Sequence, residues 1–140
     1  MSRDSRTDGR PTILVVDDTP ENLAYFGEIL SDHFRVRVAN SGTRALEAAH
    51  QSPIPDLVLL DVVMAGMDGF AVFQSLRSSP VTRDVPVIFV TGHEKLDGEL
   101  QGLAVGAADY LTKPVDPHRA IARIRSVLAT RSASRPATQS

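Results

Sequence analysis

The chain has 140 residues, a length typical of one domain, and it contains no cysteine, which excludes disulfides, thiolate metal sites and cysteine nucleophiles. Its formal net charge is −2, but residues 11–130 carry ten basic and fifteen acidic side chains, a net charge of −5. An acidic domain with few lysines is a poor binder of nucleic acid, and no apolar run is long enough to span a bilayer.

Both ends of the chain are expected to be flexible tails around one folded domain, residues 11–130. Residues 1–10 alternate charges, which is the opposite of a secretory signal. Residues 131–140 are rich in Ser, Ala, Thr and Pro and hold no large apolar side chain, so they cannot bury enough surface to order themselves. The lack of cysteine fits a reducing compartment, and we expect a cytoplasmic protein.

Strand and helix patterns alternate along the central part of the chain. Apolar or alternating runs predict strands at residues 12–16, 34–38, 56–60, 85–90 and 107–111. Helical spacing of apolar residues predicts a helix after each strand, around residues 23–30, 45–49, 70–76, 96–105 and 121–128. Thr19 and Ser41 are expected to cap the first two helices, and Pro117 is expected to begin the last helix.

The alternation of five strands with five helices predicts a parallel sheet with helices on both faces. The continuously apolar strands belong at its centre, and the alternating strand at 34–38 and the short strand at 107–111 belong at its edges. The expected strand order is 2-1-3-4-5, which is a flavodoxin-like, doubly wound α/β fold.

Polar residues stand where the predicted strands end. Asp17 and Asp18 follow the first strand, Asp61 the third, Thr91 the fourth and Lys113 the fifth. Each alone is most often a turn residue, a cap or a surface charge, but in doubly wound sheets these strand ends meet at the ligand site. Three neighbouring carboxylates repel each other, so the site makes sense only with a cation, and oxygen ligands favour Mg²⁺ or Mn²⁺.

The chain resembles the receiver domain of bacterial two-component response regulators. Four motifs carry the resemblance, ILVVDDTPENL (13–23), PDLVLLDVVMAGMDGF (55–70), VPVIFVTG (85–92) and GAADYLTKPVDP (106–117). They cover about residues 11–130 in matching order and spacing. Ala65 stands where the family usually has proline, and no reacting group is lost. The sequences of these motifs are similar to those of receivers that precede cyclic-di-GMP phosphodiesterase domains or accompany sensor kinases.

The resemblance implies a phosphoacceptor and a metal site. Asp61 would accept the phosphoryl group by forming an acyl phosphate. Asp18, Asp61 and the backbone carbonyl of Val63 would ligate Mg²⁺, or Mn²⁺ in its place, directly. Asp17 would hold the ion mainly through water.

The resemblance also implies a switch around this site. Lys113 would pair with Asp61 or with the bound phosphoryl group, and the Lys113–Pro114 peptide bond is expected to be cis. Thr91 would donate its hydroxyl to a phosphoryl oxygen. Tyr110 would then turn inward, although a half-buried strand aromatic without a switching role is nearly as good an interpretation.

The function implied is that of a phosphorylation switch and not of an enzyme, with only self-phosphoryl transfer and slow self-dephosphorylation. A sensor histidine kinase or phosphotransfer protein would phosphorylate Asp61, and a downstream protein effector or a fused output domain would read the result. A phosphorylation-dependent homodimer through residues 94–130 is a further candidate. With only a tail expected after residue 130, the chain would act by protein contact or as one piece of a longer protein.

Three alternatives fit the residues less well. A Mg²⁺-dependent phosphohydrolase usually has a second acid two residues after its nucleophile, where this chain has Val63. An FMN carrier would need a phosphate-cradling loop after the first strand, where Asp17 and Asp18 stand. A degenerate receiver that serves only as a scaffold would not need the intact set of acids.

Overall fold

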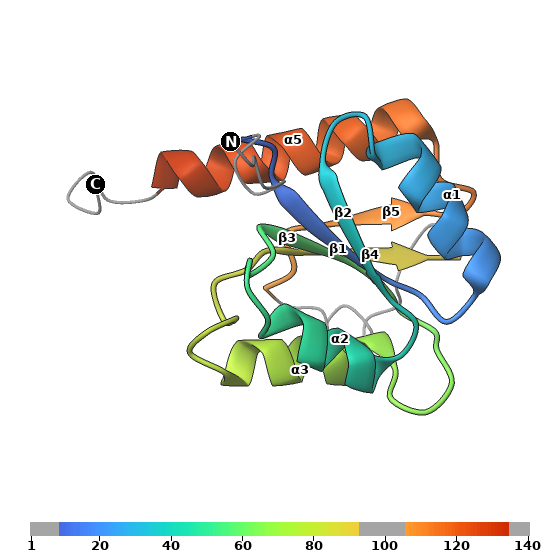
Figure 1. Ribbon diagram of the computed structural model, residues 1–140, viewed down its shortest axis with the longest axis vertical. Helices are drawn as coiled ribbons and strands as arrows, with labels where there is room; N and C mark the ends of the chain where they lie inside the picture. Colours follow the sequence, from blue (N-terminus) through green and yellow to red (C-terminus); the bar gives the residue numbers. More distant parts are fainter. Residues whose placement is uncertain (1–8, 93–105, 135–140) are drawn as a thin grey trace, which may run out of the picture.

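The structure is a computed structural model, and it describes residues 9–92 and 106–134. The described strands form one parallel sheet in the order β2-β1-β3-β4-β5, flanked by helices (Figure 1). The strands are β1 (Thr12–Val16), β2 (Arg35–Ala39), β3 (Leu57–Asp61), β4 (Val87–Thr91) and β5 (Asp109–Thr112). The helices are α1 (Pro20–Leu30), α2 (Gly42–Ala49), α3 (Gly69–Ser78) and α5 (Pro117–Ser134). The predicted flavodoxin-like fold and strand order are confirmed, while the helix predicted at 96–105 lies outside the described residues.

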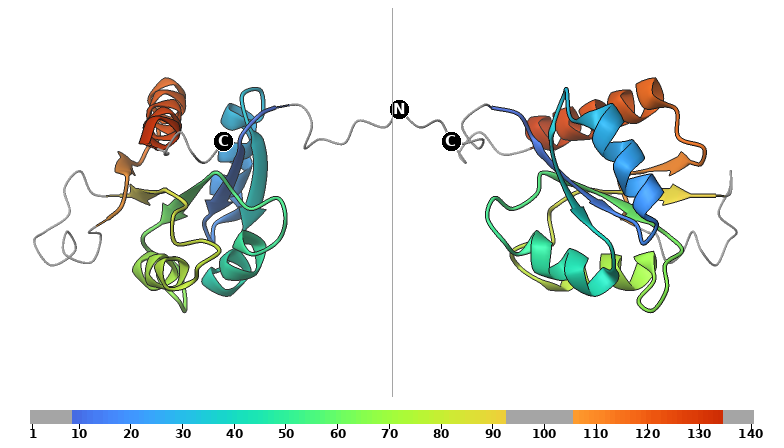
Figure 2. Two further views of the ribbon diagram at one scale, coloured as in Figure 1. Left: turned by 90° about the vertical axis from the view of Figure 1, so that its left-hand side faces the viewer. Right: turned by 45° about the vertical axis from the view of Figure 1, so that its right-hand side comes forward.

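The sheet lies between two helical layers. Helices α1 and α5 cover one face and α2 and α3 cover the other, as both views in Figure 2 make plain. Strand β1 serves both layers, because side chains alternate between the faces of a strand: Ile13 and Val15 pack with α1 and α5, whereas Leu14 and Val16 pack with α2 and α3. This two-sided burial explains why the central strands are continuously apolar.

Two strands end one residue later than their apolar runs predicted. Strand β3 ends at Asp61 and β4 at Thr91, because the backbone of each still pairs with the next strand. Strand β4 also begins later, at Val87 instead of residue 85, since Pro86 has no N–H to offer the ladder. Two residues expected just beyond the strands are therefore held inside the sheet.

The helix caps agree only in part with the sequence. Thr19 occupies the N-cap position of α1 and Pro20 the first helical position, but the Thr19 side chain makes no capping bond, contrary to expectation. Ser41 caps α2 as predicted, because its hydroxyl accepts from the amide of Arg44 at 3.1 Å. Asp68 caps α3, which the sequence analysis did not foresee.

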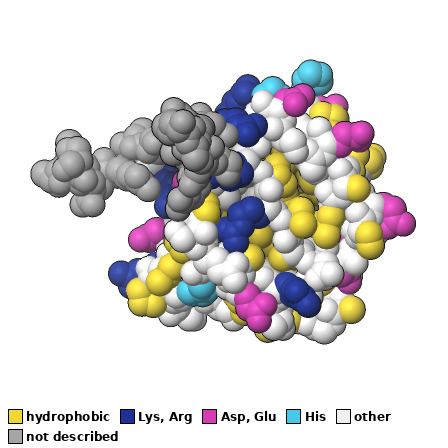
Figure 3. Space-filling view, in the orientation of Figure 1, with side chains coloured by type: hydrophobic (Ala, Val, Ile, Leu, Met, Phe, Trp, Pro, Cys, Tyr) yellow, Lys and Arg dark blue, Asp and Glu magenta, His cyan; other side chains and the backbone are white. Residues whose placement is uncertain are grey.

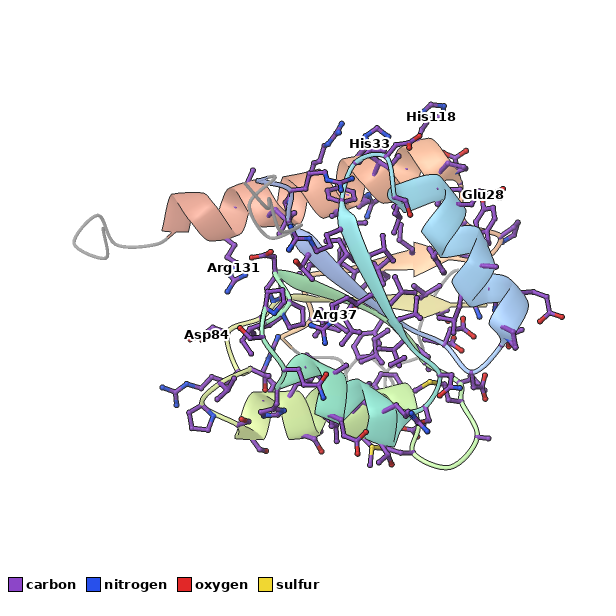
Figure 4. All side chains as sticks on the ribbon, in the orientation of Figure 1. Glu28, His33, Arg37, Asp84, His118 and Arg131 are labelled. Atoms are coloured by element: carbon purple, nitrogen blue, oxygen red, sulfur yellow. The ribbon has the colours of Figure 1, made fainter. Side chains whose placement is uncertain are left out.

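Helix α5 continues to Ser134, four residues beyond the expected domain end at residue 130. Arg131, predicted to lie in a tail, points from α5 toward the sheet in Figure 4 and donates to the carbonyl oxygen of Asp56 at 2.9 Å. Among the described residues, no helix combines the length and the apolar character needed to cross a membrane.

Strand β2 is an outer edge of the sheet, as its alternating sequence predicted. Val38 is 53% exposed on this edge, and Figure 3 shows hydrophobic side chains lying among scattered charged ones on this side of the molecule. Arg37, labelled in Figure 4, donates to the carbonyl oxygens of Ala48 and Pro53, both at 2.8 Å. The basic side chain thereby ties the edge strand to the end of α2.

A close backbone approach at the start of α3 gives the first testable prediction. A Cβ atom at Gly69 would lie 2.2 Å from the carbonyl oxygen of Asp61, whereas one at Gly27 in α1 would meet nothing within 4 Å. We expect Gly69→Ala to lower the free energy of unfolding by about 1–3 kcal/mol, as forced overpacking does. Gly27→Ala should raise it by about 0.5–1 kcal/mol, because alanine is the better helix former. Urea denaturation measures both, and equal effects would contradict this account of Gly69.

Candidate functional site

Three aspartates meet at the carboxyl ends of the two central strands. Asp17 and Asp18 directly follow β1, Asp61 is the last residue of β3, and the two strands pair in parallel. One carboxylate oxygen from each lies within 4.8 Å of the others. Asp17 is 1% and Asp61 5% exposed, whereas Asp18 is open to solvent. Two of the three charges are thus withdrawn from water, where their mutual repulsion is poorly screened.

Lys113 brings a positive charge to this cluster. Its backbone follows β5 directly, and its amide donates to the carbonyl oxygen of Thr91 at 2.8 Å. Its ammonium nitrogen lies 3.2 Å from Oδ1 of Asp61 and 3.5 Å from Oδ2 of Asp17. One ammonium group therefore bridges both buried carboxylates. The Lys113–Pro114 bond is cis, as the resemblance implied, and Ser52–Pro53 is also cis, which was not foreseen.

Backbone and side-chain donors hold the two aspartates that follow β1. Asp17 accepts from the amide of Thr19 at 2.9 Å and from the side-chain amide of Asn22 at 3.1 Å. Asp18 accepts from the amide of Ala65 at 2.9 Å. This last bond joins the loop after β1 to the loop after β3. Asp17 is therefore well supplied with donors, while Asp18 is exposed to solvent.

A pocket of about 400 Å³ opens beside these residues. It is lined by Asp18, Thr19, Asp61, Val63, Met64, Ala65, Gly92 and Lys113. The Val63 side chain is 74% exposed at its mouth, so the second residue after Asp61 offers bulk but no polar side-chain group. Acidic and basic groups thus share one small, open pocket that can take a metal ion and a small anion together.

Thr91 and Tyr110 differ in their relation to the pocket. Thr91 ends β4 and is 4% exposed, and its backbone fixes the start of the segment that carries Lys113. Tyr110 lies on β5 with 40% of its surface exposed. The structure therefore gathers Asp17, Asp18, Asp61 and Lys113 in one place, with Thr91 beside them, and leaves Tyr110 at the surface.

The surroundings of Asp61 disfavour its charge. Burial raises the pKa of the Asp61 carboxyl above its ordinary value, and the nearby charge of Asp17 raises it further. The ammonium group of Lys113 and the backbone amide of Val63 act in the opposite direction, because both stabilise the carboxylate. The net effect is a carboxyl group whose ionised form is less stable than that of an ordinary aspartate. Such a raised pKa is expected of a group in a reactive or metal-binding pocket.

Two residues of α1 that touch this region were missed by the sequence analysis. Asn22 contacts Asp17, as described above, and the Tyr25 hydroxyl donates to the carbonyl oxygen of Val115 at 2.6 Å. Asn22 lies in a motif singled out from the sequence, but nothing there indicated its partner. The bond of Tyr25 joins residues 90 positions apart, and single-sequence patterns give no signal for such a contact.

The fold and the pocket together define a flavodoxin-like domain with an acidic, lysine-bearing site at the carboxyl ends of its strands. The family description of the response regulator receiver domain matches residues 13–125 of the chain. The chain belongs to the response regulator receiver domain family.

Individual relatives agree with this assignment. Protein PilH of Pseudomonas aeruginosa is 38% identical over 118 residues, which cover 84% of this chain and 97% of that protein. A probable cyclic di-GMP phosphodiesterase of Vibrio cholerae is 46% identical over 104 residues, 74% of this chain but 23% of that protein. The solved structure of chemotaxis protein CheY4 of Vibrio cholerae has 27% identity and a TM-score of 0.78, covering 85% of this chain and 99% of its own. The chain spans about a quarter of the length of the first curated relatives it matches.

The raised pKa of Asp61 predicts a pH-dependent effect on stability. At pH 3.5 the carboxyl is mostly protonated in the unfolded chain, where its ordinary pKa is about 3.9, and more fully in the folded chain, so Asp61→Asn should change stability little there. As the pH rises through the raised folded pKa, ionisation costs the folded wild type more than the unfolded chain. At pH 7 we therefore expect Asp61→Asn to melt at a higher temperature than the wild type.

Thermal melts between pH 3.5 and 7 measure this difference, and Asp68→Asn is the matched control. Asparagine caps a helix about as well as aspartate, so this exposed substitution should leave the melting temperature nearly unchanged. A gain in Asp61→Asn that is equal at both pH values would show that packing, and not ionisation, causes it.

Proposed function

We propose that this chain is a phosphoryl-accepting switch in which a sensor histidine kinase or a phosphotransfer protein phosphorylates Asp61 in a Mg²⁺-dependent reaction. One observation carries the proposal. The ammonium group of Lys113 lies 3.2 Å from a buried Asp61 carboxylate that belongs to a cluster of three acids. A structural ion pair would need one acid for one base, whereas a phosphoacceptor site needs the surplus of acid to hold a metal ion.

The surplus of carboxylate oxygen fits a hard divalent cation such as Mg²⁺, for which Mn²⁺ can substitute. Asp18, Asp61 and the backbone carbonyl of Val63 would hold the ion directly, as the resemblance to receivers implies. Asp17 already accepts from three donors, which supports a contact through water only. When bound, the ion supplies positive charge that offsets the carboxylates and attracts phosphoryl oxygens.

The chemistry assigned to the residues is a phosphoryl transfer between two proteins. An oxygen of the Asp61 carboxylate attacks phosphorus, the bond from phosphorus to the donor's histidine nitrogen breaks, and an acyl phosphate remains on Asp61. Lys113 pairs with a phosphoryl oxygen as a point charge, and the Thr91 hydroxyl donates to another. Tyr110, now 40% exposed, would turn inward as the end of β4 shifts.

The output we propose is a changed surface that another protein reads. The candidate surface comprises β5, α5 and residues 94–105, and that last segment lies outside the described residues. The protein that recognises this surface is a separate effector or an output domain fused to the receiver. The match covers only about a quarter of the longer curated relatives, which is consistent with such a fusion. Pairing of two copies through this surface is a further form of output.

Basic residues of α5 are candidates for contacts between two copies of the chain. Arg123 pairs with Asp109 of the same chain at 2.7 Å, and Arg125 contacts His33 at 3.0 Å. Both guanidinium groups are thus engaged within the chain, so a second copy would have to compete with these contacts. Arg119 is exposed at the start of the helix and stays a better candidate for such a contact.

Labelling with a small phosphoryl donor tests the proposed function. Acetyl phosphate with Mg²⁺ should add one phosphoryl group, and a chelator should prevent it. Asp61→Asn should abolish labelling because the amide has no carboxylate oxygen to attack phosphorus. Asp56→Asn is the matched control, since Asp56 lies at the opposite end of β3. Intact-mass spectrometry provides the count, and undiminished labelling of Asp61→Asn would overturn the proposal.

The lifetime of the phosphorylated state gives another prediction. Val63 is exposed beside Asp61 and has no hydrogen-bonding side-chain group, so it cannot orient the attacking water. We expect slow self-dephosphorylation, and Val63→Asn should accelerate it by roughly 10-fold, below the ~10²–10⁴-fold of a well-placed general base. Decay of radiolabel after removal of the donor measures the rate. An unchanged rate in Val63→Asn with a slower one in His93→Ala would assign the water to His93, which lies outside the described residues.

A further inference from the structure

Helix α1 presents two side chains, Asn22 and Tyr25, to the surroundings of Lys113. They stand three residues apart and thus share one face of the helix. Asn22 donates to Oδ2 of Asp17 at 3.1 Å, and Tyr25 donates to the carbonyl oxygen of Val115 at 2.6 Å. One helical turn therefore reaches the acid beside Lys113 and the backbone two residues after it.

The position of the Lys113 ammonium group depends on what holds its surroundings. A lysine side chain is a point charge on a flexible four-carbon stem, so its own geometry does not fix the charge. Its amide is fixed to β4 through the carbonyl oxygen of Thr91 at 2.8 Å. On the other side of the cis proline, the bond from Tyr25 to Val115 fixes the segment to α1. The backbone that carries the lysine is thus held from two elements.

The partner of the ammonium group is held in the same way. Oδ2 of Asp17 receives both the Asn22 amide and, at 3.5 Å, the Lys113 ammonium group. Because Asp17 is 1% exposed, water cannot take over when the ammonium group moves away. Asn22 and the amide of Thr19 would still satisfy the carboxylate. Lys113 can therefore move from Asp17 to a phosphoryl group, and the buried Asp17 carboxylate would still have hydrogen-bond donors.

We propose that Asn22 and Tyr25 are positioning residues that place the Lys113 ammonium group between Asp17 and Asp61 and so set the rate of phosphoryl transfer to Asp61. This inference rests on the proposed function for its effect on rate, but the placement itself is a property of the unphosphorylated protein. Tyr25 acts on the backbone after the lysine, and Asn22 acts on the acid that shares it. Neither side chain touches the reacting atoms, so each acts through Lys113.

Tyr25→Phe removes the donor and leaves the ring. At saturating acetyl phosphate and Mg²⁺, we expect the labelling rate to fall about 3–10-fold, the factor that corresponds to loss of one hydrogen bond. The Mg²⁺ dissociation constant without donor should change less than 2-fold, since the proposed ligands come from the end of β3 and from the loops after β1 and β3. The ¹³Cε chemical shift of Lys113 should also change, because it reports the surroundings of the ammonium group directly. Asn22→Ala should move the same shift and lower the same rate.

Thr82→Val is the matched control. Thr82 is fully buried and donates its hydroxyl to the carbonyl oxygen of Leu76 at 2.7 Å, at the end of α3 and apart from the site. Its substitution removes a bond of the same kind at a similar cost in stability, and it should leave both the labelling rate and the Lys113 shift unchanged. Equal effects of Thr82→Val and Tyr25→Phe would reduce Tyr25 to a structural role and overturn the inference.

The two readouts separate the inference from the proposed function. If acetyl phosphate does not label the wild type, the proposed function is wrong. The proposed influence of Asn22 and Tyr25 on the rate of phosphoryl transfer is then wrong as well, whatever the Lys113 chemical shift shows. If the wild type is labelled but Tyr25→Phe and Asn22→Ala match it in rate and in shift, the proposed function stands and the positioning role is overturned. A changed shift with a slower rate and unchanged Mg²⁺ affinity supports both.

Discussion

Two carboxylates, those of Asp17 and Asp61, are buried side by side with one ammonium group between them, and the rest of the site follows from this arrangement. A buried charge needs partners, and Lys113 alone cannot neutralise two acids. The deficit is met in two ways. Asp17 collects amide donors from the start of α1, while burial and the charge of Asp17 raise the pKa of Asp61. Asp61 is thus the less satisfied of the two, which suits a group that is to react.

The parallel sheet creates this constraint and also supports it. Asp61 and Thr91 are the last residues of their strands, so the backbone that carries them is held by ladder bonds rather than by a loop. Gly69 lies so close to the carbonyl group of Asp61 that no side chain would fit there, and the start of α3 therefore packs directly against the end of β3. Acidic side chains on a rigid edge cannot move apart to relieve repulsion. The repulsion is relieved by positive charge, which Lys113 supplies in part, and the remaining ways to relieve it are a proton or a metal cation.

The sequence predicted the sheet order and the residues at its carboxyl edge because both follow from apolar periodicity and from the rule that ligands bind at those strand ends. It placed the ends of β3 and β4 one residue early, since the ladder continues after the apolar run has stopped. It placed the end of the folded domain at residue 130, since the Ser/Ala-rich segment after it lacks apolar signal, while Arg131 gains a partner only in the fold. The contacts of Asn22 and Tyr25 were not predicted. Asn22 donates to Asp17 through the turn into α1, for which the sequence pattern gave no signal, and Tyr25 donates to Val115, 90 positions away.

The balance of charge suggests why a single ammonium group can serve as the moving part of the switch we propose. Three carboxylates and one ammonium group leave the site with a formal charge of about −2, which a divalent cation would cancel. Phosphorylation replaces the single negative charge of the Asp61 carboxylate by a phosphoryl group with a charge of about −1.5 to −2 and strong acceptor oxygens. Asp17 would then compete poorly for Lys113, because it keeps its amide donors and carries less negative charge than the phosphoryl group. The transfer of one ammonium group from Asp17 to the phosphoryl group converts a local change of charge into a displacement at the end of β5, where the chain enters α5.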